Sequence, residues 1–286
     1  MDFYQKDFDP TSILMNNRPI EDFEGFSSTD MHYLVYNTFS PDSPFQIKKN
    51  IPDNILDQIP FLLQIEFLLS RINDLGELKL TAKGFLPTTI VKEIYDLGLI
   101  KDYAIEKGII KLYAETCSQP INLTRLITEL AGFTKKRHNK LTLTKTWRDK
   151  LLTKNRQDIF LQTFSTFAQK FNWGYFDRYS SQATGNIGFA YSLYLLSKYG
   201  DNERLVSFYS EKYLRAFPSL IESFTDVPWM TDKNRSFISC YSVRTYDRFL
   251  DYFNFITIRT DGSRYDDSKK YVKKSPIFDD IITFDI

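Results

Sequence analysis

Lysine and arginine side chains crowd into one stretch of the chain, between Lys135 and Arg156. The stretch holds nine bases and a single acid, Asp149, so its formal charge is +8. Clustered cations of this kind neutralise phosphates and release counterions, which is the chemistry of nucleic-acid binding. The residues that we expect to contact DNA or RNA are Lys135, Lys136, Arg137, Lys140, Lys145 and Arg148.

The same stretch has a second interpretation, because the N-terminal part of the chain is acidic. Residues 1–60 contain ten acids and four bases. The whole chain is almost neutral, with 37 bases and 36 acids, so charge argues for nucleic acid only locally. The basic stretch could instead contact an acidic partner protein or the chain's own N-terminal arm, or be a solvated face. No pattern of residues points to the reading of base edges.

The residue patterns of common catalytic and metal sites are missing from the sequence. The histidines, His32 and His138, and the cysteines, Cys117 and Cys240, form no spacing typical of a zinc site. No phosphate-binding glycine loop and no nucleophile elbow occurs. We therefore expect no metal and no other cofactor. The sequence favours a non-enzymatic protein, and an enzyme with a dispersed site stays open.

The cysteine content and the apolar stretches bear on location. Two distant cysteines exclude a disulfide scaffold and favour reduced thiols, as in the cytoplasm. The first ten residues lack the basic and apolar regions of a signal peptide. The apolar runs "FLLQIEFLL" and "IGFAYSLYLL" are too short to cross a bilayer. We expect a cytoplasmic protein without a membrane partner.

The periodicity that must position these residues is mainly helical, with small β-ribbons, which predicts an α+β protein. Ser27 and Asp30 have the spacing of a helix capping box. An apolar run ending at Gly76 predicts a central helix, and the aromatic stretch 156–225 predicts the packing body. Short strands are expected at "ELKLT", "GIIKLYAE" and "LTLT". The segment 255–284 predicts a two-stranded ribbon.

Two stretches in the middle of the chain carry a resemblance to a known family. "LTRLITELAGF", the basic turn "TKKRHNK" and "LTLT" resemble the recognition helix and wing of bacterial winged-helix regulators. "LKLTAKGFL" and "NKLTLTKTWRDKLL" are similar stretches, since both place Leu, a polar residue, Leu and Thr in strand-like alternation. In the family, a Leu-Thr pair on the wing strand often precedes a Lys-Gly and a helix, and "LKLTAKGFL" has this form. In the second stretch Lys145-Thr146-Trp147 replaces the glycine turn. An alternative register makes a helix-turn-helix with Gly132 in the turn. The two registers differ in which helix would face DNA.

The resemblance implies a helical body with two or three winged-helix-like units. Such units serve as DNA readers and as protein-interaction modules, and the chain also resembles bacterial proteins of unknown function. The expected domains are an acidic arm with a short helix (1–55), two winged-helix-like units (56–155), an aromatic helical body (156–225), and a C-terminal helix with a winged-helix-like β-ribbon (226–286).

Overall fold

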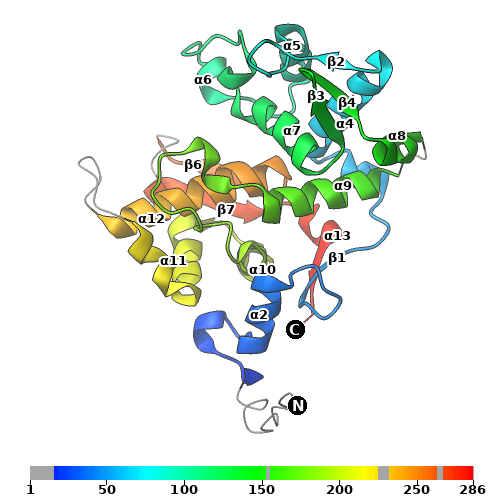
Figure 1. The fold of residues 1–286 in the computed structure, drawn as a ribbon. Helices are drawn as coiled ribbons and strands as arrows, with labels where there is room; N and C mark the ends of the chain where they lie inside the picture. Colours follow the sequence, from blue (N-terminus) through cyan, green and yellow to red (C-terminus); the bar gives the residue numbers. More distant parts are fainter. Residues whose placement is uncertain (1–15, 153–154, 225–231, 263–266, 286) are drawn as a thin grey trace, which may run out of the picture. The chain divides into compact units, whose positions relative to one another are not determined.

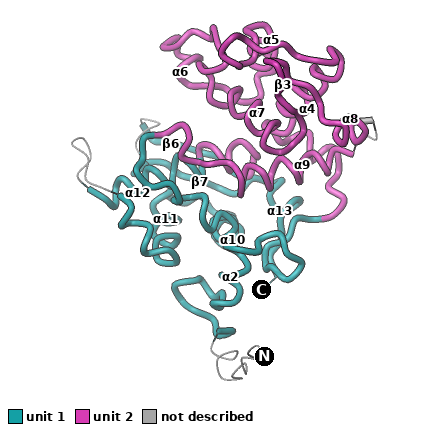
Figure 2. The backbone as a smooth tube through the Cα atoms, in the orientation of Figure 1, with its two compact units in different colours: residues 1–48, 178–246, 256–286 teal, residues 49–177, 247–255 magenta. Residues whose placement is uncertain are grey.

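A computed structural model describes residues 16–152, 155–224, 232–262 and 267–285. The described chain is mainly α-helical and carries three small antiparallel sheets, which confirms the predicted class (Figure 1). It forms two compact units (Figure 2). Unit 1 comprises residues 1–48, 178–246 and 256–286, and unit 2 comprises residues 49–177 and 247–255. No described helix combines the length and the hydropathy that crossing a bilayer requires.

Unit 2 is built around helix α4 (Pro60–Leu75). Pro60 occupies its first turn, where a missing N–H costs nothing, and Gly76 ends it with a positive φ of 71°. Six of its side chains are fully buried, each stabilising the fold by about 1.5–3 kcal/mol. They are Phe61, Leu62, Ile65, Leu68, Leu69 and Ile72. This confirms the central helix that the sequence predicts.

In chain order, the other helices of unit 2 are α3 (Asp53–Leu56), α5 (Thr88–Asp96), α6 (Tyr103–Glu106), the short 3-10 helix η2 (Glu115–Cys117), α7 (Gln119–Leu130), α8 (Lys145–Leu152), α9 (Arg156–Ser165), the π-helix η3 (Thr166–Lys170) and η4 (Trp173–Phe176). A second π-helix, η6 (Ser242–Leu250), continues into this unit.

One three-stranded sheet belongs to unit 2, with strand order β2-β4-β3. Its strands are β2 (Leu78–Lys79), β3 (Thr134–Arg137) and β4 (Lys140–Leu143). The two similar stretches of the sequence therefore supply neighbouring strands of the same sheet. The strand expected at residues 108–115 is wrong: the backbone turns there, because the N–H groups of Ile109 and Ile110 both donate to the carbonyl of Ala104.

The phenylalanines of α9 and η3 form the aromatic core of unit 2. Phe164 packs edge-on against Phe253, with ring centroids 5.2 Å apart. Phe167 stacks on Phe249 at 5.7 Å, and Trp173 lies 4.7 Å from the same ring. All five are buried, so the periodic phenylalanines are packing residues.

Unit 1 contains the chain's N-terminal and C-terminal segments. Strand β1 (Phe45–Ile47) pairs with β8 (Ile282–Phe284), and β5 (Arg204–Leu205), β6 (Ile256–Thr260) and β7 (Lys270–Lys274) form a sheet of order β5-β7-β6. The β6–β7 pair forms the first part of the predicted C-terminal ribbon, and residues 263–266 of its tip lie outside the described residues. The prediction is wrong beyond Lys274, because residues 278–281 form a helical turn and residues 282–284 pair with β1 instead of β6. The helices are η1 (Glu21–Phe23), α2 (Ser28–Tyr36), α10 (Phe189–Tyr199), α11 (Val206–Ala216), η5 (Pro218–Ser223), α12 (Lys233–Tyr241), η7 (Asp267–Lys269) and α13 (Phe278–Ile281).

Residues 16–48 of the acidic arm belong to unit 1. The capping box at the start of α2 is confirmed: Ser27 accepts from the N–H of Asp30, whose carboxylate accepts from the N–H of Ser27 at 2.8 Å. Glu24 forms ion pairs with Lys198 and Lys212, and Tyr199 donates a hydrogen bond to it. Glu24 thereby anchors the arm to α10 and α11.

Candidate nucleic-acid interface

The register of the unit 2 sheet creates a row of three directly opposed cations. Lys79 of β2 lies opposite Lys140 of β4, and Lys140 lies opposite Arg137 of β3. Opposed residues of an antiparallel pair project from the same face of a sheet, at a Cβ separation of about 5 Å. We call Lys79, Lys140 and Arg137 the cationic row. Sequence reasoning missed Lys79, because its place in the row depends on pairing between strands 60 residues apart.

Alternation along the strands divides the sheet into a core face and an outer face. Leu78, Leu141 and Leu143 are buried on the core face. The outer face carries the cationic row together with Lys135 and Thr142, which are themselves opposed across β3 and β4. Four of the five side chains on this face are therefore basic, and Lys79, Lys135 and Arg137 are exposed.

The charges of the outer face are little compensated within the protein. Lys140 forms an ion pair with Glu77, with Nζ 2.5 Å from the carboxylate oxygen, and both side chains are about half exposed. An exposed pair of this kind contributes about 0–1 kcal/mol. Lys79, Lys135 and Arg137 form no ion pair with any residue that the structure describes. The outer face therefore holds a net positive field that an anion can reach.

The hairpin that carries these cations is fixed at its turn. His138 and Asn139 both have positive φ, 47° and 58°, as a two-residue turn requires. The side-chain amide of Asn139 donates to the carbonyls of Leu80 and Thr81, at 3.1 and 2.6 Å, and the N–H of Leu80 donates to the carbonyl of Asn139 at 2.9 Å. These contacts join the two similar sequence stretches and hold the cations in place.

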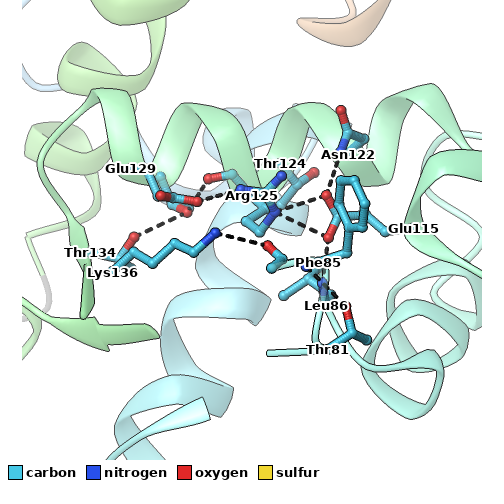
Figure 3. Close-up of polar contacts among 12 residues, drawn as sticks. Thr81, Phe85, Leu86, Glu115, Asn122, Thr124, Arg125, Glu129, Thr134 and Lys136 are labelled. Carbon is cyan, nitrogen blue, oxygen red and sulfur yellow. Dashed lines mark hydrogen bonds and ion pairs between the residues drawn. The ribbon is translucent and has the colours of Figure 1, made fainter. Parts of the chain in front are cut away.

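Lys136 differs from the other predicted contact residues. It lies opposite the buried Leu141, so its side chain leaves the sheet on the core side. Its Nζ reaches the carbonyl of Gly84 at 3.3 Å, beside Phe85 (Figure 3). Lys136 thus secures the turn after β2 and stands apart from the cationic row.

The remaining bases of the stretch follow β4 on α8 and α9. Lys145 and Arg148 are exposed and form no ion pair with a described residue. Lys150 pairs with Asp158 at 3.0 Å and lies 4.7 Å above the ring of Trp147. Lys154 lies outside the described residues. The structure thus leaves two α8 cations available beside those of the sheet.

Arg156 is neutralised by acids of its own unit. Its guanidinium forms two hydrogen bonds with the Glu66 carboxylate, at 2.8 and 3.0 Å, and one with Asp57 at 2.7 Å. Asp53 lies 3.5 Å away. The hydrogen bonds to Glu66 raise the pKa of Arg156 further above its usual value. Asp53 and Asp57 belong to the acidic first 60 residues, so this end of the stretch does contact that segment.

Helix α7 is held by a buried ion pair that the sequence did not reveal (Figure 3). Glu115 is fully buried and accepts hydrogen bonds from the N–H of Leu86 at 2.5 Å, from Arg125 Nε at 2.8 Å and from Asn122. Burial lowers the pKa of Arg125, and the charges and hydrogen bonds of Glu115 and Glu129 together outweigh this, so the pKa is raised. The pair joins the turn before α5, η2 and α7, and its role is structural.

Most of α7 is inaccessible as a result. Eight of its twelve residues are buried, from Pro120 to Arg125 together with Ile127 and Thr128. The positions that keep appreciable exposure near its C-terminal end are Leu126, Glu129 and Leu130. An acid and two leucines do not suit a phosphate-lined groove. The accessible positive charge of this region lies on the sheet and α8.

A polar cluster in unit 1 joins Ser242, Asp267 and Lys270. Ser242 Oγ donates to Asp267 at 2.5 Å, and Lys270 Nζ lies 2.9 Å from both Ser242 Oγ and the Asp267 carboxylate. Ser242 and Lys270 are both buried, so a substrate cannot reach the hydroxyl. The contacts therefore join η6 to β7 rather than prepare a nucleophile.

Comparison of the chain with protein-family models, curated proteins and solved structures finds no significant match. Among the described residues, no three His, Cys, Asp or Glu side chains converge in a way that could hold a metal ion. The geometry of the basic residues is thus the feature on which a functional proposal depends.

Proposed function

We propose that the protein binds nucleic acid without acting as an enzyme, through a basic surface made of the outer sheet face and the start of α8. This surface comprises Lys79, Lys135, Arg137, Lys140, Lys145 and Arg148. The observation that carries the proposal is the cationic row, because directly opposed like charges destabilise a sheet and are relieved when phosphates neutralise them.

The order of the elements supports a winged-helix-like unit over residues 60–143. Helix α4, strand β2, helices α5 and α7, and the β3–β4 hairpin follow one another, and β2 pairs with the returning strand β4. In this proposal the two similar sequence stretches belong to one unit, and the hairpin is its wing. Neither Cys117 nor Cys240 forms a disulfide, which suits a protein that works in the reducing cytoplasm.

A salt-titrated anisotropy assay with a labelled 24-base-pair duplex tests the proposal. Changing Lys79, Lys135, Arg137 and Lys140 together to Gln should weaken binding. The negative slope of log K against log salt should become shallower by about 3 to 4, since each lost phosphate contact contributes about 0.9. The matched control changes four exposed bases elsewhere to Gln, namely Lys92, Lys170, Arg215 and Lys233. Equal binding by both variants would contradict the proposal.

The alternative, an interaction scaffold whose basic surface contacts an acidic protein or the N-terminal arm, makes a different prediction. Glu24 of the arm is already paired with Lys198 and Lys212. If the protein binds polyglutamate but no nucleic acid, and the sheet variant loses that binding, the alternative replaces the first proposal. Tighter binding after removal of residues 1–15 would support the arm as the competing occupant.

A further inference from the structure

We propose that the ligand of the basic surface is a double-stranded nucleic acid, held by its phosphates without reading of the base sequence. This inference rests on the proposed function and specifies the class of partner. It depends on which groups accompany the cations on the surface and which do not.

Stacking groups for unpaired bases are scarce on this surface. Proteins that hold single strands place bases on exposed aromatic rings. The outer sheet face carries Lys79, Lys135, Arg137, Lys140 and Thr142, none of which is aromatic. Trp147 is buried with its ring edge-on to Phe133, 4.4 Å between centroids. His138 at the hairpin turn is the exposed ring among the described residues 131–150.

Two of the groups that could read base edges are committed to the fold, whereas Arg137 and Arg148 remain exposed. Sequence is read mainly by Arg, Asn and Gln side chains on an element that enters a groove. Asn139, the amide on the hairpin, donates to the carbonyls of Leu80 and Thr81. Arg125 of α7 is buried against Glu115. The exposed end of α7 presents Glu129 and Leu130, which a phosphate-lined groove would repel or leave unpaired.

The arrangement of the charges matches the charge density of a duplex. The cationic row crosses three strands, so its ends lie roughly 10 Å apart, and Lys135 adds a second row beside it. A duplex carries one charge per about 1.7 Å of axis, about twice the density of one strand. A compact, rigid group of four cations therefore meets more phosphates on a duplex than on an extended strand.

The test compares binding to 24-base-pair DNA duplexes that are AT-rich, GC-rich or mixed, to the separated strands, and to an RNA duplex of the mixed sequence. At one salt concentration, the DNA duplexes should bind within about 3-fold of one another and the single strands at least about 10-fold more weakly. Phosphate contacts alone predict that DNA and RNA duplexes both bind. The ratio of the two affinities shows which kind of duplex the protein prefers.

Several outcomes would overturn the inference and leave the proposed function standing. Single strands that bind as tightly as duplexes would overturn it. The case would be strongest if His138→Ala abolished the binding of single strands and left the binding of duplexes unchanged. A preference above about 10-fold for one duplex sequence would show base readout. Absence of binding to every probe would instead remove the proposed function itself.

Discussion

Arg137 lies directly opposite Lys140 across the β3–β4 pair, and both side chains leave the sheet on its outer face. Lys79 extends the same row on the other side of Lys140. Charges of one sign in opposed positions weaken an antiparallel pair by up to about 1 kcal/mol. This arrangement works against folding, so stability and ligand binding should respond to it in opposite directions.

We expect Arg137→Thr to stabilise the protein and to weaken its binding to nucleic acid. Removing the repulsion and adding a β-branched side chain should raise the free energy of unfolding by about 0.2–1 kcal/mol. The slope of log K against log salt should fall by about one, because one phosphate contact is lost. Urea unfolding and salt-titrated anisotropy measure the two effects on the same samples.

The matched control is Lys273→Thr, since Lys273 is an exposed strand residue that lies opposite the neutral Thr257. It should change the free energy of unfolding by no more than a few tenths of a kcal/mol and should leave the salt slope unchanged. If Arg137→Thr proved as neutral as this control in both measurements, the cationic row would have no energetic meaning.

Local patterns in the sequence were sufficient to predict the central helix and the start of α2, but not the short helix α13 or the composition of the site. Pro60 and Gly76 delimit α4, and Ser27 with Asp30 begins α2, because these signals act within a few residues. The same reasoning failed at residues 108–115, where alternation suggested a strand. No other strand pairs with that segment, and Gly108 instead takes a positive φ of 69° within a turn.

The composition of the basic surface depended on contacts that no local pattern encodes. Lys79 joins Lys140 only because β2 pairs with β4, and Lys136 is absent from the outer face because alternation directs it to the other side of the sheet, where it stays exposed. Glu115 and Arg125 are ten residues apart, and charged residues usually lie at the surface, yet both are buried. Partners of that kind become visible only when the chain is folded.

Gly84 should be needed for its backbone conformation more than for the space beside it. Its φ is +80°, and a Cβ at this position would lie 2.2 Å from Lys136 Nζ. Because the lysine end is flexible, it can move, whereas the strain of the left-handed backbone remains at about 1–2 kcal/mol. Gly84→Ala should therefore lower the free energy of unfolding by about that amount in urea titrations.

Gly98 provides the control for this prediction. Its φ is +67° and no atom lies within 4 Å of its Cβ position, so Gly98→Ala carries the strain of a positive φ without the contact. The two substitutions should cost similar amounts, and adding Lys136→Ala to Gly84→Ala should recover less than about 0.5 kcal/mol. A large recovery would show that the lysine contact dominates.

Removal of the Glu115 charge should severely destabilise unit 2. Glu115→Gln removes the buried counter-charge of Arg125 and leaves its guanidinium paired only with Glu129, which is less buried, so the cost should approach the about 3–5 kcal/mol typical of a broken buried pair. The double change Glu115→Leu with Arg125→Met removes both charges. It should recover part of that loss and still leave about 1–3 kcal/mol, because the N–H of Leu86 loses its acceptor. Urea unfolding of the three proteins would reveal whether the single change is the worse one.

Acid should release the anchor that Glu24 forms on α10 and α11. Burial raises the pKa of Glu24, and the hydrogen bonds from Lys212, Tyr199 and Lys198 outweigh this, so the pKa lies below its ordinary 4.5. A carboxyl whose pKa is lowered by folding stabilises the protein fully above its ordinary value, and the contribution is lost as pH falls through the folded value. Glu24→Gln should therefore melt below the wild type at pH 7, and the two midpoints should converge toward pH 3.

The control is Glu211→Gln, which removes an exposed carboxylate from α11 and should match the wild type at both pH values. If the difference between Glu24→Gln and the wild type persisted undiminished in acid, the charge of Glu24 would not be what anchors the arm.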